Sequence, residues 1–131
     1  MIDARELRIG NYVNVPILKQ CPFRIDSIEH LHPRDNFGKF GMYYDEFPNG
    51  HPLTWYLKDL TPIPLTEEWL VRFGFEKINT TWYAYKGGNF RLNISFDVEW
   101  ANNWMGIRLK HVNSLQNLYF ALTGKELELK Q

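Results

Sequence analysis

The sequence predicts an α+β fold made of an N-terminal small SH3-like β barrel followed by an α-β-β-β-α two-layer unit. Pro62 and Pro64 remove backbone donors and push the residues before them toward extended geometry, so a β segment ends there. Short alternating apolar runs fill the first half, and two helical patterns flank a diglycine hairpin in the second. We place the units at residues 1–61 and 66–131 and expect them to pack together, because a piece of about 65 residues buries only about 60% of its unfolded surface and is marginally stable alone.

Composition excludes several classes of function. The 131 residues carry 15 basic and 15 acidic side chains, so no overall basic excess is available to bind nucleic acid. One cysteine cannot form an intrachain disulfide, and no apolar run reaches the roughly 18 residues of a membrane span. The N-terminus lacks the apolar core of a secretory signal. We therefore expect a cytoplasmic protein that needs no cofactor and does not enter a membrane.

The first half reads as short strands separated by polar turns. Apolar residues at every second position from Leu7 to Val15 predict a strand with one buried face. Further strands are expected over 23–29, 39–47 and 55–60, with turns at 32–36 and 48–52. Since closure hides the edges of short strands, this pattern favours a small SH3-like barrel.

A short helix opens the second half. Thr66 is a typical N-cap, and Glu67 and Glu68 follow in the first turn, where the helix dipole favours negative charge. Trp69 and the apolar residues after it fall on one face, and Gly74 is placed to end the helix as its C′ residue. A helix of about two turns is stable only when it docks on other elements.

A hairpin around Gly87-Gly88 is expected next, because paired glycines meet the positive-φ demand of a two-residue turn. The register then pairs Tyr83 with Leu92 and continues to residue 96. A third strand includes Met105, Ile107 and Leu109. The residues predicted to face the core from the hairpin are Tyr83, Tyr85, Phe90, Leu92, Ile94 and Phe96.

The closing helix has Asn113 as its expected cap, Gln116 in capping-box position and Gly124 as its end. Its apolar face, with the spacing i, i+3, i+4, i+7, is expected to cover the sheet of the second unit. Residues 125–129 alternate and predict a short final strand. The apolar face consists of Leu115, Leu118, Tyr119 and Leu122.

Three motifs resemble an uncharacterised family of small proteins encoded in Bacteroidetes genomes, often within prophages and other mobile elements. They are Leu7-Arg8-Ile9-Gly10-Asn11-Tyr12-Val13; residues 62–70 with Phe73-Gly74-Phe75; and residues 115–124 with Glu126-Leu127. The resemblance spans most of the chain but not residues 20–55. It implies an accessory protein of phage or mobile-element origin and no assigned activity or ligand.

Metal and thiol chemistry have weak support in the sequence. His30, His32, Asp35, His51 and Cys21 are metal-capable, but their spacing matches no common zinc pattern. No activating partner can be named for a Cys21 nucleophile, and the adjacent acids of the chain read as solvated side chains. We expect no metal and no catalytic residue, with a metal-dependent or thiol enzyme a distant third possibility.

The hairpin register gathers two indoles and four cations on the side of the sheet away from the core. Interfaces favour Trp and Arg, so we expect a non-enzymatic adaptor that binds a protein partner there. Indoles also stack on bases while cations take phosphates, so single-stranded nucleic acid is the alternative. In a third reading, this side packs against the first unit or the two indoles pair with each other. The oligomeric state stays open. The predicted binding residues are Trp82, Lys86, Arg91, Trp104, Arg108 and Lys110.

Overall fold

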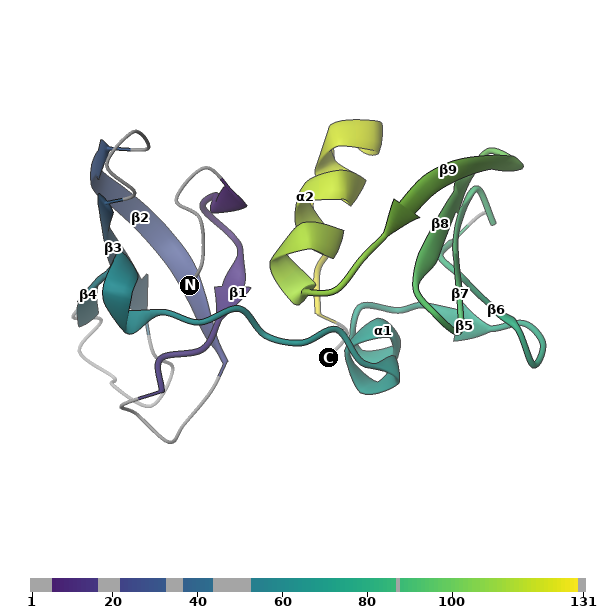
Figure 1. Ribbon diagram of the computed structural model, residues 1–131, viewed down its shortest axis with the longest axis horizontal. Coiled ribbons are helices and arrows are strands. Elements are labelled where there is room, and N and C mark those ends of the chain that lie inside the picture. The colour runs from purple at the N-terminus through teal and green to yellow at the C-terminus, as the bar shows by residue number, and fades with distance from the viewer. Residues whose placement is uncertain (1–5, 17–21, 33–36, 44–52, 87, 130–131) are drawn as a thin grey trace. The chain divides into compact units, whose positions relative to one another are not determined.

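The computed structural model describes residues 6–16, 22–32, 37–43, 53–86 and 88–129 (Figure 1). It confirms the predicted α+β class and, over these residues, shows a four-stranded sheet, a five-stranded antiparallel sheet and two α-helices, α1 and α2. The chain forms two compact units, each assembled from two segments. Unit 1 comprises Met1–Ile63 and Val112–Glu126, and unit 2 comprises Pro64–His111 and Leu127–Gln131.

Unit 1 contains an open antiparallel sheet in the order β1-β2-β3-β4. The strands are β1 (Tyr12–Val13), β2 (Phe23–His32), β3 (Phe37–Tyr43) and β4 (Leu53–Tyr56), and a 3₁₀ turn, η3 (Leu57–Asp59), replaces the end of the predicted 55–60 strand. Asn14 and Thr61 exchange two backbone hydrogen bonds of 2.9 Å. The described strands do not close into a barrel, so the SH3-like prediction is not confirmed. Residues 44–47 of the predicted third strand, and the predicted turn at 48–52, lie outside the described residues.

Gly10 interrupts the strand that alternation predicts from Leu7 to Val15. Its φ of +97° lies in the region that favours glycine, and β1 begins only at Tyr12. Ile9, predicted to be buried, is 57% exposed as a result. The residues before and after the break still reach the core of unit 1, which consists of Leu7, Val13, Val15, Phe23, Ile25, Phe40, Leu57 and Leu60.

Helix α2 (Val112–Thr123) contacts β1, and both belong to unit 1. The predicted division had assigned this helix to residues 66–131, to cover the second sheet. Asn113 does not cap the helix, which begins one residue earlier; its Nδ2 lies 3.4 Å from the carbonyl oxygen of Glu6. Gly124 ends the helix with a φ of +72°, as predicted. Residues 125–129 form no strand.

Helix α1 (Glu67–Arg72) of unit 2 confirms the prediction at both ends. The Oγ1 of Thr66 accepts a hydrogen bond of 3.4 Å from the Trp69 backbone N–H. Gly74 follows the C-cap residue with a φ of +94°, which few other residues adopt without strain. The apolar face of the helix is buried at Trp69, Leu70 and Phe73.

The sheet of unit 2 is an antiparallel meander in the order β5-β6-β7-β8-β9 (Figure 1). Its strands are β5 (Glu76–Lys77), β6 (Trp82–Ala84), β7 (Phe90–Asn93), β8 (Asp97–Trp100) and β9 (Asn103–Arg108). Its inner side is buried and aromatic, with ring centroids of Phe75 and Phe90 at 5.8 Å and of Phe90 and Trp100 at 6.1 Å. The fully or nearly fully buried residues of these strands are Tyr83, Phe90, Leu92 and Val98.

The hairpin between β6 and β7 keeps the predicted register but not the predicted turn. Tyr83 lies opposite Leu92, as expected. The Tyr85 N–H donates to the Phe90 carbonyl at 3.0 Å and the Gly88 N–H to the Tyr85 carbonyl at 2.8 Å, so the reversal is longer than two residues. The loop takes one more residue from each strand than predicted, so the pairing of the remaining strand residues is unchanged. Each of these residues therefore keeps its predicted side of the sheet.

The chain then turns earlier than predicted. Asn93 Oδ1 accepts hydrogen bonds from the backbone N–H of Ser95 at 2.9 Å and of Asp97 at 3.0 Å, which reverses the chain after β7. Ile94, predicted to face the core, is 60% exposed, and Phe96 takes a φ of 63°. The prediction of a single strand that continues to residue 96 is therefore wrong, because β7 ends at Asn93. The predicted third strand corresponds to β9, the last of the five strands.

Candidate functional site

The strand register brings four of the six predicted binding residues to one side of the unit 2 sheet. Residues directly opposite each other in an antiparallel pair point to the same face. Arg91 lies opposite Glu99, and Glu99 lies opposite Trp104. We call this side the outer face; its strand residues are Trp82, Ala84, Arg91, Asn93, Asp97, Glu99, Trp104 and Arg108.

The two remaining predicted residues lie at the margins of this sheet. Lys86 follows β6 in the loop before β7, with its Nζ 5.9 Å from the ring centroid of Tyr85. Lys110 follows β9. Both side chains are exposed.

Trp104 is the most prominent apolar group of the outer face. It is 61% exposed, although a tryptophan normally buries most of its ring. Trp82 lies on the same face but on β6, three strands away from β9, and is half-buried. An exposed indole on a regular strand has a fixed backbone, so it offers contact area to a ligand without ordering a loop.

Carboxylates that the sequence reading did not assign to this face balance its cations. Arg108 donates from Nε to Asp97 Oδ1 at 2.9 Å and from Nη2 to Oδ2 at 3.3 Å. The hydrogen bond from Arg108, and then the one from Asn93, hold the pKa of Asp97 below its usual value. Glu99 stands opposite both Arg91 and Trp104. The outer face therefore combines two indoles with the Arg108–Asp97 ion pair and a carboxylate, Glu99, opposite Arg91, and it is not a cationic surface.

A signal for these acids was present in the sequence. Asp97 and Glu99 alternate with Val98 and Trp100, the pattern of a strand with one buried face. The next strand follows a tight turn at Ala101 and Asn102, whose φ values are 49° and 67°. Asn tolerates positive φ, so a hairpin could have been predicted here.

Tyr83 is the one buried titratable group of this sheet with a shifted pKa, among the residues described. Burial raises the pKa of its hydroxyl, and the hydrogen bond and charge of Glu67 raise it further. Glu67 lies in the first turn of α1. The pair links the helix to the sheet, and a hydroxyl held neutral in this way is not an activated nucleophile.

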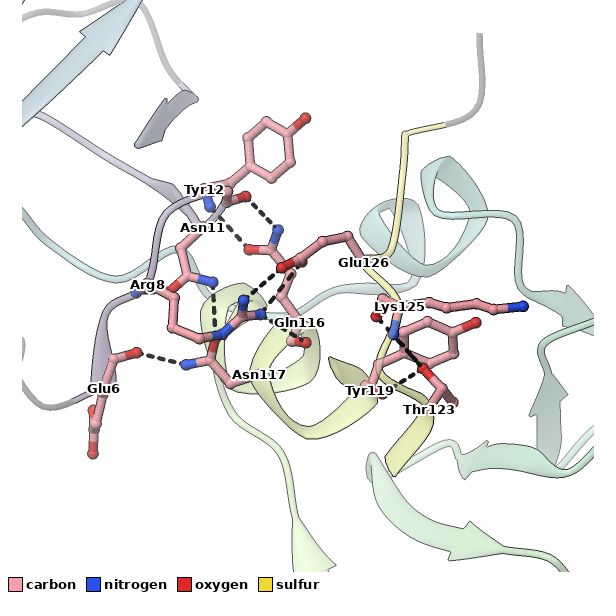
Figure 2. A network of polar contacts seen from close by, with 11 residues as sticks. Glu6, Arg8, Asn11, Tyr12, Gln116, Asn117, Tyr119, Thr123, Lys125 and Glu126 are labelled. Carbon is pink, nitrogen blue, oxygen red and sulfur yellow. Dashed lines mark hydrogen bonds and ion pairs between the residues drawn. The ribbon is translucent and has the colours of Figure 1, made fainter. Parts of the chain in front are cut away.

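A second polar cluster lies in unit 1, where Arg8 binds several groups of α2 and the residues after it (Figure 2). Its Nε donates to Asn117 Oδ1 at 2.8 Å, and its Nη2 to the Gln116 carbonyl at 3.3 Å. The carboxylate of Glu126 accepts from Nη1 and Nη2. The guanidinium also lies 4.4 Å from the ring centroid of Phe120.

Gln116 holds the backbone of the segment that leads into β1. Its Oε1 accepts from the Tyr12 N–H at 2.9 Å (Figure 2). Its Nε2 donates to the Gly10 carbonyl at 2.8 Å. The predicted capping-box role is therefore wrong: the side-chain amide pairs with a peptide as a neighbouring strand would. The adjacent Asn117 accepts from Asn11 Nδ2 at 2.9 Å. Gln116 and Asn11 are fully buried.

This cluster accounts for much of the first and third motifs quoted above. Arg8, Gly10 and Asn11 come from the first motif, and Gln116, Asn117 and Glu126 from the third. Their interactions satisfy one another within unit 1 and fix α2 against the sheet. We interpret the cluster as structural, because its buried polar groups are directed at backbone and side chains of the chain itself.

The described residues contain no group of three or more His, Cys, Asp or Glu side chains that could hold a metal ion. Cys21, Asp35 and His51 lie outside those residues. His30 and His32 fall in β2, and only the backbone of these two residues is described.

Comparison with protein-family models, with curated proteins and with solved structures gave no match to this chain. Within the described ranges, neither helix has the length and apolar character needed to cross a membrane.

Proposed function

We propose that this chain is a non-enzymatic accessory protein that binds a protein partner through the outer face of unit 2. The observation that carries the proposal is Trp104, which is 61% exposed on a strand whose backbone is fixed by β8. Tryptophan and arginine are the residues that most often dominate the energy of protein interfaces, and Arg91 and Arg108 share this face.

The charge arrangement favours a protein over nucleic acid. Arg108 directs two of its nitrogens to Asp97, and Glu99 lies opposite Arg91. A phosphate backbone would have to compete with these carboxylates and would be repelled by them. Single-stranded nucleic acid remains the second candidate, because two indoles and the exposed Lys86 and Lys110 accompany the face.

The proposed cellular location and origin rest on the sequence alone. We propose a cytoplasmic protein of phage or mobile-element type, on the resemblance of its three motifs and on its single cysteine.

Affinity capture from lysate of the natural host, with and without nuclease, tests the proposal. We expect a discrete protein to be retained by the wild type at moderate salt and after nuclease treatment. Trp104→Ala and Trp82→Ala should each reduce its recovery at least about fivefold, as expected for interface anchors. Val71→Ala is the matched control, because Val71 is 53% exposed on α1 of the same unit.

Two results would reject the protein-partner proposal. Equal recovery with Val71→Ala and Trp104→Ala would place the contact elsewhere. Retention that disappears with nuclease, falls steeply with salt and depends on Arg91 would instead support single-stranded nucleic acid.

A further inference from the structure

We infer that strand β9 receives an extended, acidic segment of the partner, which would add a sixth strand to the unit 2 sheet. This inference rests on the proposed function and names the form of its partner. β9 is the last strand in the sheet order, and no described strand pairs with its other side. An edge strand presents a row of backbone N–H and C=O groups that an extended peptide can pair with.

The two edges of this sheet are unequal. β5, at the opposite edge, has only two residues, whereas β9 has six. Five of the six β9 residues are exposed, and Met105 is half-buried. The longer edge is therefore the one that can offer several consecutive backbone groups.

Gly106 limits where the added strand can pair. Between the pairs Glu99–Trp104 and Asp97–Arg108, three residues of β9 stand against the single Val98 of β8, which is a β-bulge. Gly106 occupies the bulge with a φ of +67°. Regular pairing is thus available at Asn103 and Trp104, the two residues before the bulge, and a contact this short is expected to be weak and reversible.

Charge complementarity at the free edge specifies the occupant, because Asp97 and Glu99 of the outer face lie on β8 and not on the edge strand. The segment from Asn103 to Lys110 contains Arg108 and Lys110 and no carboxylate. The Arg108 side chain is 61% exposed, and its Nη1 takes no part in the pair with Asp97, which uses Nε and Nη2. An incoming strand with Glu or Asp side chains would meet these cations, while a basic strand would be repelled.

The test titrates the full-length ¹⁵N-labelled protein with three synthetic peptides. The first alternates Val and Thr with two Glu residues, the second replaces Glu by Lys, and the third is the Glu peptide with alternate backbone nitrogens methylated. We expect the Glu peptide to shift the amide signals of Asn103, Trp104 and Met105. Binding should be about tenfold weaker for the Lys peptide and for the methylated peptide, which lacks ladder donors.

Equal binding of the methylated peptide would overturn the strand-addition inference, as would shifts confined to Trp82 and Arg91. Equal binding of the Lys peptide would overturn the assignment of an acidic occupant, and absence of any shift at millimolar peptide would overturn the whole inference. The proposed function fails separately, when host protein capture is indifferent to Trp104→Ala. Spectra of Trp104→Ala, which show whether unit 2 is folded, keep that variant interpretable.

Discussion

Gln116 is a buried polar side chain that stabilises unit 1 through hydrogen bonds to two backbone groups. Its amide satisfies the Gly10 carbonyl and the Tyr12 N–H, groups that a continuous strand would have paired with a neighbour. The sequence reading assigned it to a capping box, because local spacing cannot distinguish a side chain that turns back on its own helix from one that reaches a segment about a hundred residues away. Only the tertiary fold separates the two.

Replacing Gln116 by Leu should destabilise unit 1. The substitution keeps the approximate size but leaves one donor and one acceptor without partners, at a cost on the order of 2–4 kcal/mol for the two. Urea unfolding followed by circular dichroism measures the change in free energy. Glu128→Leu, at an exposed position outside the helix, serves as the control. A loss below about 0.5 kcal/mol would mean that the two contacts contribute nothing.

Asp97 should titrate below its usual pKa because Arg108 donates two hydrogen bonds to its carboxylate. A lowered folded pKa means that the stabilisation is present above the unfolded pKa of 3.8 and is lost as the pH falls through the folded value. Carboxyl ¹³C NMR titration of the wild type should show a midpoint below 3.8, and Arg108→Gln should raise it. A midpoint that does not move would show that the pair does not form in solution.

At the scale of elements, prediction succeeded where the signal is local. The Thr66 cap, the Gly74 and Gly124 helix ends and the pairing of Tyr83 with Leu92 depend on a few adjacent residues, and the structure confirms them. The break at Asn93 was missed because its side chain competes with the strand for backbone donors, which an alternating pattern does not reveal.

The candidate site shows the same limit. The residues expected on the outer face of the strands, Trp82, Arg91, Trp104 and Arg108, do share it, because the longer hairpin loop preserves the register. The acids beside them were not foreseen, since their strand was not recognised. The sequence therefore predicted the indoles and arginines of the outer face but not the two carboxylates that balance their charge.

Gly106 is expected to determine the shape of β9. A φ of +67° strains any residue with a side chain by about 1–2 kcal/mol, even though no atom lies within 4 Å of the added Cβ. Gly106→Val should therefore destabilise unit 2 or remove the bulge, while Gly106→Asn, which tolerates this region, should cost less. Thermal unfolding compares the two. Equal stability of the Val and Asn variants would contradict a positive φ at this position.

At the scale of the whole molecule, each unit is assembled from two separated segments. In unit 1 a backbone hydrogen bond of 2.9 Å joins the two segments, from the Val112 N–H to the Ile63 carbonyl. In unit 2 the Leu65 N–H donates to the Lys110 carbonyl, also at 2.9 Å, which joins the two ends of the Pro64–His111 segment. The chain first passes from unit 1 to unit 2 between Ile63 and Pro64, within the proline pair at which the sequence analysis placed a joint. The sequence could not show that α2 returns to unit 1, because the contacts of Arg8 and Gln116 connect opposite ends of the sequence.

The division also separates two kinds of polar chemistry. The buried amides and the Arg8–Glu126 pair of unit 1 bind the chain to itself, whereas the outer face of unit 2 presents an exposed indole together with the Arg108–Asp97 ion pair. This contrast is the basis for assigning recognition to unit 2.

The most direct test of that assignment is photo-crosslinking in the natural host with a light-activated amino acid at position 104 or, for comparison, at position 71. Both positions are exposed in unit 2, on β9 and on α1. We predict one discrete protein adduct from position 104 and none of comparable yield from position 71. Adducts of equal yield at the two positions, or an adduct to nucleic acid alone, would contradict the assignment.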